Sequence, residues 1–155
     1  MSDIFDAKCP LKSPASKEGK LLLAKIFIDR CDRMLDLLKR RYELDKKTES
    51  QYDWLHNIHT ELFTNMRTFY ASEYAEFQKL PEDEDGMINA TVMFNPTNAM
   101  YGFDMIRNHV DWILDSMEKF IDDPLVPCTF YLQAGDAKDS MLHLDKIYRQ
   151  LLKRD

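Results

Sequence analysis

Glycine is scarce in this chain, with 4 copies among 155 residues, against an average share of about 7%. Because glycine serves tight turns, so few copies favour few turns and long helices. Proline is confined to positions 10, 14, 81, 96, 124 and 127, which leaves four long stretches without a helix breaker. The sequence therefore predicts a mainly α protein whose helices end near its prolines.

Cysteine is also rare, and Cys9, Cys31 and Cys128 are too far apart to form a Cys-x-x-Cys pair. This odd, scattered set indicates neither a disulfide framework nor a zinc knuckle. No apolar run approaches the roughly 18 residues of a membrane span, and the first residues carry Asp3 and Asp6 where a signal peptide would be apolar. We therefore expect a cytoplasmic protein with no membrane association.

An excess of positive charge is missing as well. The chain has 21 Lys and Arg against 27 Asp and Glu, for a formal net charge of −6. A negative protein repels phosphate backbones unless a local basic patch overrides the repulsion. We therefore expect no nucleic-acid partner.

Apolar residues recur at helical spacing over four segments, at about 17–45, 48–79, 97–122 and 137–153. The second segment starts with Thr48 and Gln51, a capping-box pair, and the fourth follows Gly135 with Asp136 as its cap. This pattern predicts an up-and-down four-helix bundle.

We expect residues 17–155 to form a single helical domain and residues 1–16 to form a flexible arm, since the arm holds two prolines and scattered polar residues. Two short segments also fit strands. Residues 87–94 alternate apolar and polar side chains, and residues 128–133 are rich in Thr, Phe and Tyr. A small two-stranded β element beside the bundle therefore stays open, with helix as the alternative for the first segment.

The apolar face of the first helix is unusually broad, because Ile26, Leu37 and Leu44 widen the main arc. Such a helix must be covered on more than one side. Either several helices of the same chain cover it or a second subunit does, so a homodimer through the first helix is one hypothesis.

Motifs for catalysis are missing: there is no glycine-rich phosphate loop and no Gly-x-Ser-x-Gly turn. His56, His59, His109 and His143 do not share one helical phase, so we expect no metal site among them. We therefore expect no catalytic residue and no cofactor.

One enzymatic alternative remains, a divalent-metal-dependent nucleotide hydrolase. Glu73 and Glu76 of the second helix would act with acids of the third. The helical phase argues against it, because the third-helix acids should point to solvent, on the side opposite Ile106 and Val110. These acids are Asp104, Asp111, Asp115, Glu118 and Asp122.

The third helix carries a second apolar strip away from its core face, formed by Tyr101, Met105 and Trp112 at spacings of four and seven. Trp and Tyr are common anchors of protein interfaces, and Met adapts to varied surfaces. Packing within the chain, under the N-terminal arm, residues 87–94 or the two-stranded β element, is an equally good explanation of the strip. Trp54, out of phase with its helix, is a weaker candidate of the same kind.

Three carboxylates, Asp104, Asp111 and Asp115, border this strip and complete the predicted partner-binding set. An aromatic strip edged by acids suits a partner with a basic rim around an apolar groove. Imitation of DNA phosphates by the same acids is a minor alternative. We therefore expect a small acidic interaction protein, such as an adaptor, an inhibitor or an immunity-type binder.

Overall fold

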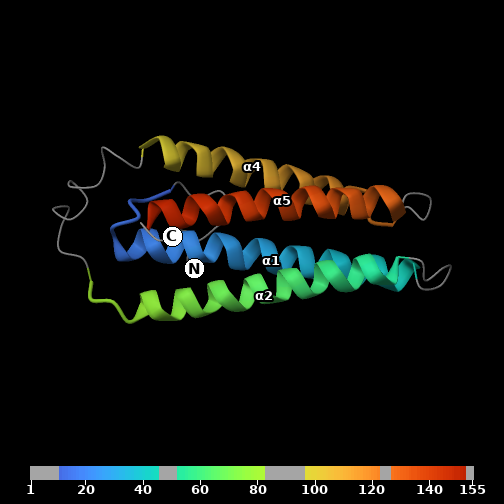
Figure 1. Ribbon diagram of the computed structural model, residues 1–155, viewed down its shortest axis with the longest axis horizontal. Coiled ribbons are helices and arrows are strands. Elements are labelled where there is room, and N and C mark those ends of the chain that lie inside the picture. Colours follow the sequence, from blue (N-terminus) through green and yellow to red (C-terminus); the bar gives the residue numbers. More distant parts are fainter. Residues whose placement is uncertain (1–10, 46–51, 83–96, 123–126, 153–155) are drawn as a thin grey trace.

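The computed structural model describes residues 11–45, 52–82, 97–122 and 127–152, and all regular structure in these ranges is helical. The helices are α1 (Lys17–Asp45), α2 (Asp53–Gln78), α4 (Thr97–Lys119) and α5 (Pro127–Leu151). Helices α1 and α2 run side by side in opposite directions, and so do α4 and α5 (Figure 1). The prediction of a mainly α protein with four helices is confirmed.

The four helices are not equivalent in the bundle. Helices α1 and α5 each contact all three others, whereas α2 and α4 do not touch each other over the described ranges. Helices α2 and α4 therefore lie at the outer corners, and α1 and α5 lie between them. Helices α2 and α4 therefore have a wider face that contacts no other helix of the described chain.

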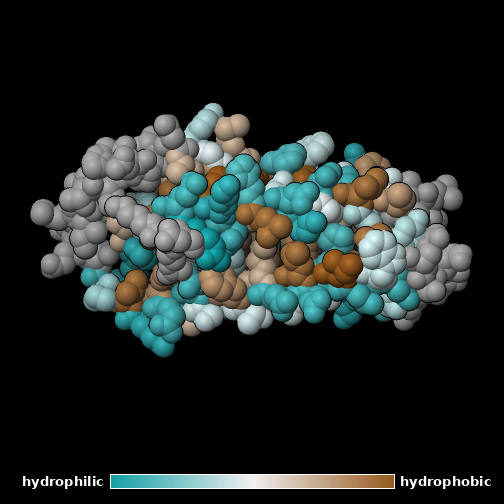
Figure 2. All heavy atoms as spheres, in the orientation of Figure 1, coloured by the Kyte–Doolittle hydropathy of each residue, from teal (hydrophilic) through white to brown (hydrophobic). Residues whose placement is uncertain are grey.

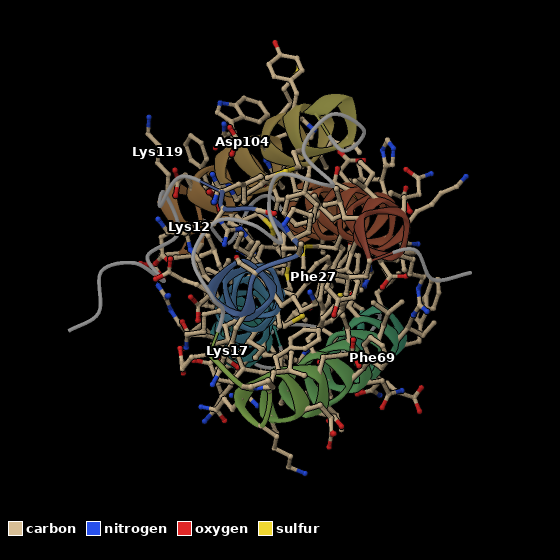
Figure 3. The ribbon with its side chains drawn as sticks, turned by 90° about the vertical axis from the view of Figure 1, so that its left-hand side faces the viewer. Lys12, Lys17, Phe27, Phe69, Asp104 and Lys119 are labelled. Carbon is tan, nitrogen blue, oxygen red and sulfur yellow. The ribbon has the colours of Figure 1, made fainter. Side chains whose placement is uncertain are left out.

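Phe27 of α1 lies at the centre of the bundle and contacts one ring from each of the other helices (Figure 3). It stacks on Tyr70 of α2 with ring centroids 3.9 Å apart, and it meets Phe103 of α4 and Tyr148 of α5 edge-on. Stacked and edge-to-face pairs add to the free energy of area burial. One side chain thus ties all four helices together.

The broad apolar face of α1 is covered by the chain's own helices. Its buried apolar residues are Leu22, Leu23, Ala24, Ile26, Phe27, Ile28, Cys31, Met34, Leu37 and Leu38. Their burial explains the breadth of the face without a second subunit. The sequence left open whether other helices of the chain or a second subunit cover this face, and in the described structure the chain's own helices cover it.

A serine cap and a glycine define the start of α1. The Ser16 hydroxyl donates to the Ser13 carbonyl oxygen at 2.8 Å and accepts the Gly19 N–H at 2.9 Å. A Cβ at position 19 would lie 1.8 Å from the Ser13 oxygen, so only glycine fits there. The helix starts at Lys17, as the spacing predicts.

The prediction that residues 128–133 form a strand is wrong. Residues 128–133 belong to α5, which starts at Pro127 and not at about 137, and the proposed cap Asp136 lies inside the helix. Proline suits the first position of a helix, and Phe130, Ala134 and Ala137 recur at helical spacing on its buried side. The first expected strand, 87–94, lies outside the described residues.

Helix α2 also begins later than expected. Its first residue is Asp53, and the preceding Tyr52 makes no side-chain capping bond. The capping pair Thr48 and Gln51 lies outside the described residues. In the described ranges, no helix combines the length and the apolar character that crossing a bilayer requires.

We expect the two described cysteines to differ sharply in reactivity. Cys31 is fully buried, and burial raises its pKa to about 12, with Asp32 adding to the effect. At pH 8 about one Cys31 in ten thousand is then a thiolate, which is the reactive form. Cys128 lies exposed in the first turn of α5. Iodoacetamide should therefore modify Cys128 and spare Cys31.

Mass spectrometry of the digested protein measures both sites. After unfolding in urea, Cys31 should react as fast as Cys128, because its pKa returns to the ordinary range. Equal labelling of the two residues in the folded protein would contradict this prediction.

Candidate functional site

Helix α4 exposes a row of large apolar side chains on the face away from the core. Tyr101, Met105 and Trp112 are 68%, 55% and 67% exposed, while Phe103 and Val110 on the opposite face are buried. Within the described residues nothing covers the three side chains. The alternative, packing under the N-terminal arm or residues 87–94, stays open, because residues 1–10 and 87–94 lie outside the described ranges.

Phe120 extends this row and was missed from the sequence. It lies eight residues after Trp112 and is 52% exposed. Its N–H donates to the Ser116 carbonyl oxygen, so the helical path continues to this residue. The spacing of eight, a little more than two turns, places Phe120 at the edge of the row and is the signal that could have found it. We call Tyr101, Met105, Trp112 and Phe120 the α4 strip.

Two neighbours steady the rings of the strip. The His109 ring lies parallel to Trp112, at 15° and 6.0 Å between centroids. The Lys119 ammonium lies 5.5 Å from the centre of the Phe120 ring. Rings already held in one orientation lose less conformational entropy when a partner covers them.

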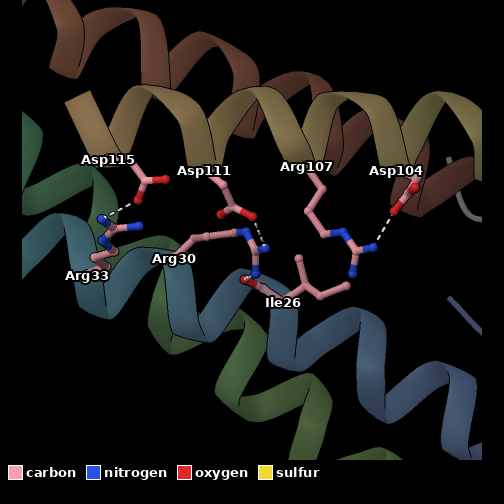
Figure 4. A network of polar contacts seen from close by, with 7 residues as sticks. All are labelled: Ile26, Arg30, Arg33, Asp104, Arg107, Asp111 and Asp115. Carbon is pink, nitrogen blue, oxygen red and sulfur yellow. Dashed lines mark hydrogen bonds and ion pairs between the residues drawn. The ribbon is translucent and has the colours of Figure 1, made fainter. Parts of the chain in front are cut away.

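Most acids of α4 are partly exposed, as the helical phase suggested, but three of them also pair with arginines of α1. Arg30 of α1 donates to Asp111 at 2.8 Å, and Arg33 donates to Asp115 at 2.7 Å (Figure 4). Arg40 donates to Glu118 at 2.7 Å further along the same two helices. Asp111, Asp115 and Glu118 thus form one side of the contact between α1 and α4.

Asp104 is paired within α4 itself, with the buried Arg107. Burial lowers the pKa of Arg30, and the Asp111 carboxylate opposes that shift. The hydrogen bonds that the exposed Arg40 donates to Glu118 and Asp36 raise its pKa. All of the α4 acids in the predicted partner-binding set therefore have an arginine partner in the same chain.

The spacing of the charged residues does not reveal these ion pairs, because the arginines are three and seven residues apart and the acids four and three. The arginines fall at positions 30, 33 and 40 of α1, and the acids at 111, 115 and 118 of α4, on two helices that run in the same direction (Figure 1). Helical phase tells which residues share a face, but it does not tell which helix lies against that face.

The carboxylates of the hydrolase alternative are not brought together. Glu73 accepts a hydrogen bond of 2.6 Å from Tyr148 of α5, and Glu76 pairs with Lys79. The α4 acids face α1, and α2 does not contact α4. Over the described ranges, no group of three His, Cys, Asp or Glu side chains could hold a metal ion.

The histidines lie on three helices. His59 of α2 is buried, with its Nδ1 2.9 Å from the Leu55 carbonyl oxygen, and His56 stacks on Tyr42 of α1. His109 and His143 are exposed on α4 and α5.

A second apolar area lies over α2 and α5. Figure 2 shows this face, with apolar side chains gathered between the two helices. Ile58 and Phe69 of α2 and Leu142 of α5 are exposed. The Arg149 guanidinium lies 5.3 Å from the centre of the Phe69 ring and partly covers it. Trp54, the weaker candidate, is 61% exposed on α2.

Comparison of the chain with protein-family models, with curated proteins and with solved structures finds no match.

We expect the ion pair between Arg30 and Asp111 to stabilise the fold more than its neighbour does. The side chains of Arg30 and Asp111 are 3% and 16% exposed, so Asp111→Asn leaves a buried guanidinium without its counter-charge. Loss of one partner of a buried pair costs about 3 kcal/mol. Urea unfolding should show that loss for Asp111→Asn.

The matched control is Asp115→Asn, one turn along, where the carboxylate is 69% exposed. An exposed pair contributes less than about 1 kcal/mol to the free energy of unfolding. Equal losses for the two variants would show that burial does not set the strength of these pairs.

Proposed function

We propose that this protein is a non-catalytic interaction module, of the adaptor, inhibitor or immunity-binder kind, that binds a partner protein through the α4 strip. The observation that carries the proposal is the exposure of Trp112 and Tyr101, each about two-thirds, on a well-packed helix. Trp and Tyr are enriched among the residues that dominate binding free energy. Water contact with such rings is unfavourable, and a partner would remove it.

The ion pairs of α4 act in this proposal as supports for the strip. Arg30 and Arg33 hold the helix through Asp111 and Asp115, which keeps the aromatic side outward (Figure 4). Asp104 and Asp115 remain partly exposed at the edge of the strip. Because arginines already neutralise them, they attract a basic rim on the partner less strongly than the sequence suggested.

The free thiols of Cys31 and Cys128 support the expectation that the protein works in a reducing compartment such as the cytoplasm.

The proposal predicts a Trp112-dependent complex. Tagged protein incubated with lysate of its source cells should retain a stoichiometric protein partner, and Trp112→Asp should lose it. Removal of an interface anchor costs about 2 kcal/mol or more, which weakens affinity roughly 30-fold.

Trp54→Asp is the matched control, because Trp54 is exposed to a similar extent on the opposite corner of the bundle. It should retain the partner. Circular dichroism should give the same helicity for all three proteins, since both tryptophans lie outside the core. Equal capture by wild type and Trp112→Asp would remove the α4 strip from the proposal.

A further inference from the structure

The exposed residues of α4 are balanced about Trp112. Met105 lies seven residues before it and Phe120 eight after, so an apolar side chain stands at nearly the same distance on each side. Charges of opposite sign accompany them, since Asp104 lies eight residues before Trp112 and Lys119 seven after. The two arms of the strip are therefore alike in apolar character and complementary in charge.

We infer that the α4 strip binds a second copy of the chain, in a two-fold symmetric pair whose axis passes beside Trp112. The inference rests on the proposed function, because it names the partner of that same surface. In an isologous contact, residue i of one copy meets residue j of the other, and j meets i. Two antiparallel α4 helices bring residues equally distant from Trp112 opposite each other.

The resulting contacts are favourable in kind. Met105 meets Phe120 of the second copy, which is a sulfur–aromatic contact, and the two Trp112 rings meet at the axis. Asp104 meets Lys119 of the second copy. The Asp104 side chain is 42% exposed even with Arg107 bonded to it, and a carboxylate has further lone pairs for another donor.

Asp104 and Lys119 also lie on the same side of α4, as this pairing requires. Viewed along the bundle, Asp104 and Lys119 both project from α4 away from α5 (Figure 3). The two-fold axis lies between the two antiparallel α4 helices and is perpendicular to both. Under this symmetry, a given side of α4 in one copy lies next to the same side of α4 in the other copy. Acid and amine therefore meet along one edge.

The size of the strip sets the strength of the pair. Aromatic side chains bury about 150–250 Å² each when fully covered. With roughly half to two-thirds of each side chain exposed, the strip offers on the order of 500 Å² per copy, below the roughly 800 Å² of a standard interface. We therefore expect a weak dimer that dissociates in the micromolar range.

Sedimentation velocity across a concentration series tests the pair directly. Wild-type protein should shift from 18.4 kDa toward twice that mass as its concentration rises to about 1 mM. Trp112→Asp should stay monomeric, and Trp54→Asp should follow the wild type. A wild type that is monomeric throughout, or a Trp54→Asp variant that is equally monomeric, would overturn the inference.

Disulfide trapping tests the register. In a background with Cys9 and Cys128 replaced by serine, Met105→Cys and Phe120→Cys proteins are mixed and oxidised. The inferred pair predicts cross-links between the two variants and none within either alone, since two copies of residue 105 lie about 21 Å apart along the helices. Preferential cross-linking of each variant with itself would overturn it.

The outcomes separate this inference from the proposed function. A monomeric wild type that captures another protein through Trp112 supports the proposed function and overturns the second copy as partner. A dimer that Trp112→Asp does not disturb removes the α4 strip from the self-contact. A dimer lost in Trp112→Asp, with cross-links in the predicted register, supports the inference.

Discussion

Helix α1 is buried over much of its surface and carries two arginines into that buried region, where their guanidinium groups need hydrogen-bond acceptors. Arg30 is 3% exposed and Arg41 is fully buried. Arg30 donates to the Asp111 carboxylate of α4 and to the Ile26 carbonyl oxygen of α1, and Arg41 donates to the Ile121 carbonyl oxygen just past the end of α4. A buried guanidinium without its counter-charge would cost several kcal/mol, so the bond from Arg30 to Asp111 favours a rotation of α4 that turns Asp111 toward α1. That rotation leaves Trp112 on the outer side of the helix.

Helices α2 and α5 meet through a second set of polar contacts. Tyr70 of α2 donates to Asp145 of α5, and Tyr148 of α5 donates to Glu73 of α2 at 2.6 Å. Each helix therefore donates one phenol hydrogen bond to a carboxylate of the other. Burial, and then the bond to Asp145, raise the pKa of Tyr70, which keeps this phenol protonated as a donor. These bonds fix the register of two helices that run in the same direction, while the aromatic cluster around Phe27 supplies the apolar contact between them.

Much of the fold could be predicted because prolines and apolar spacing are properties of single segments. The bounds of α1 and the outward phase of Tyr101 and Trp112 follow from such local information. The pairing of Asp111 with Arg30 could not, because it depends on which helix lies beside α4. The prediction of a strand at residues 128–133 was wrong because the β preference of Thr and aromatic residues is weak. Pro127 at the start of the helix and the core positions of Phe130 and Ala134 outweigh that preference.

The candidate site follows from the same constraint as the fold. A helix at a corner of the bundle needs one apolar stripe that faces the core, and α4 also needs acids that pair with α1. The remaining face contacts solvent, where charged residues are usual. Helix α4 instead has Tyr, Met and Trp on that face. Their exposure brings no stabilisation to the described fold, and the ion pairs to α1 prevent α4 from rotating to hide them. A contact outside the described fold is therefore the physical reason that remains for this strip.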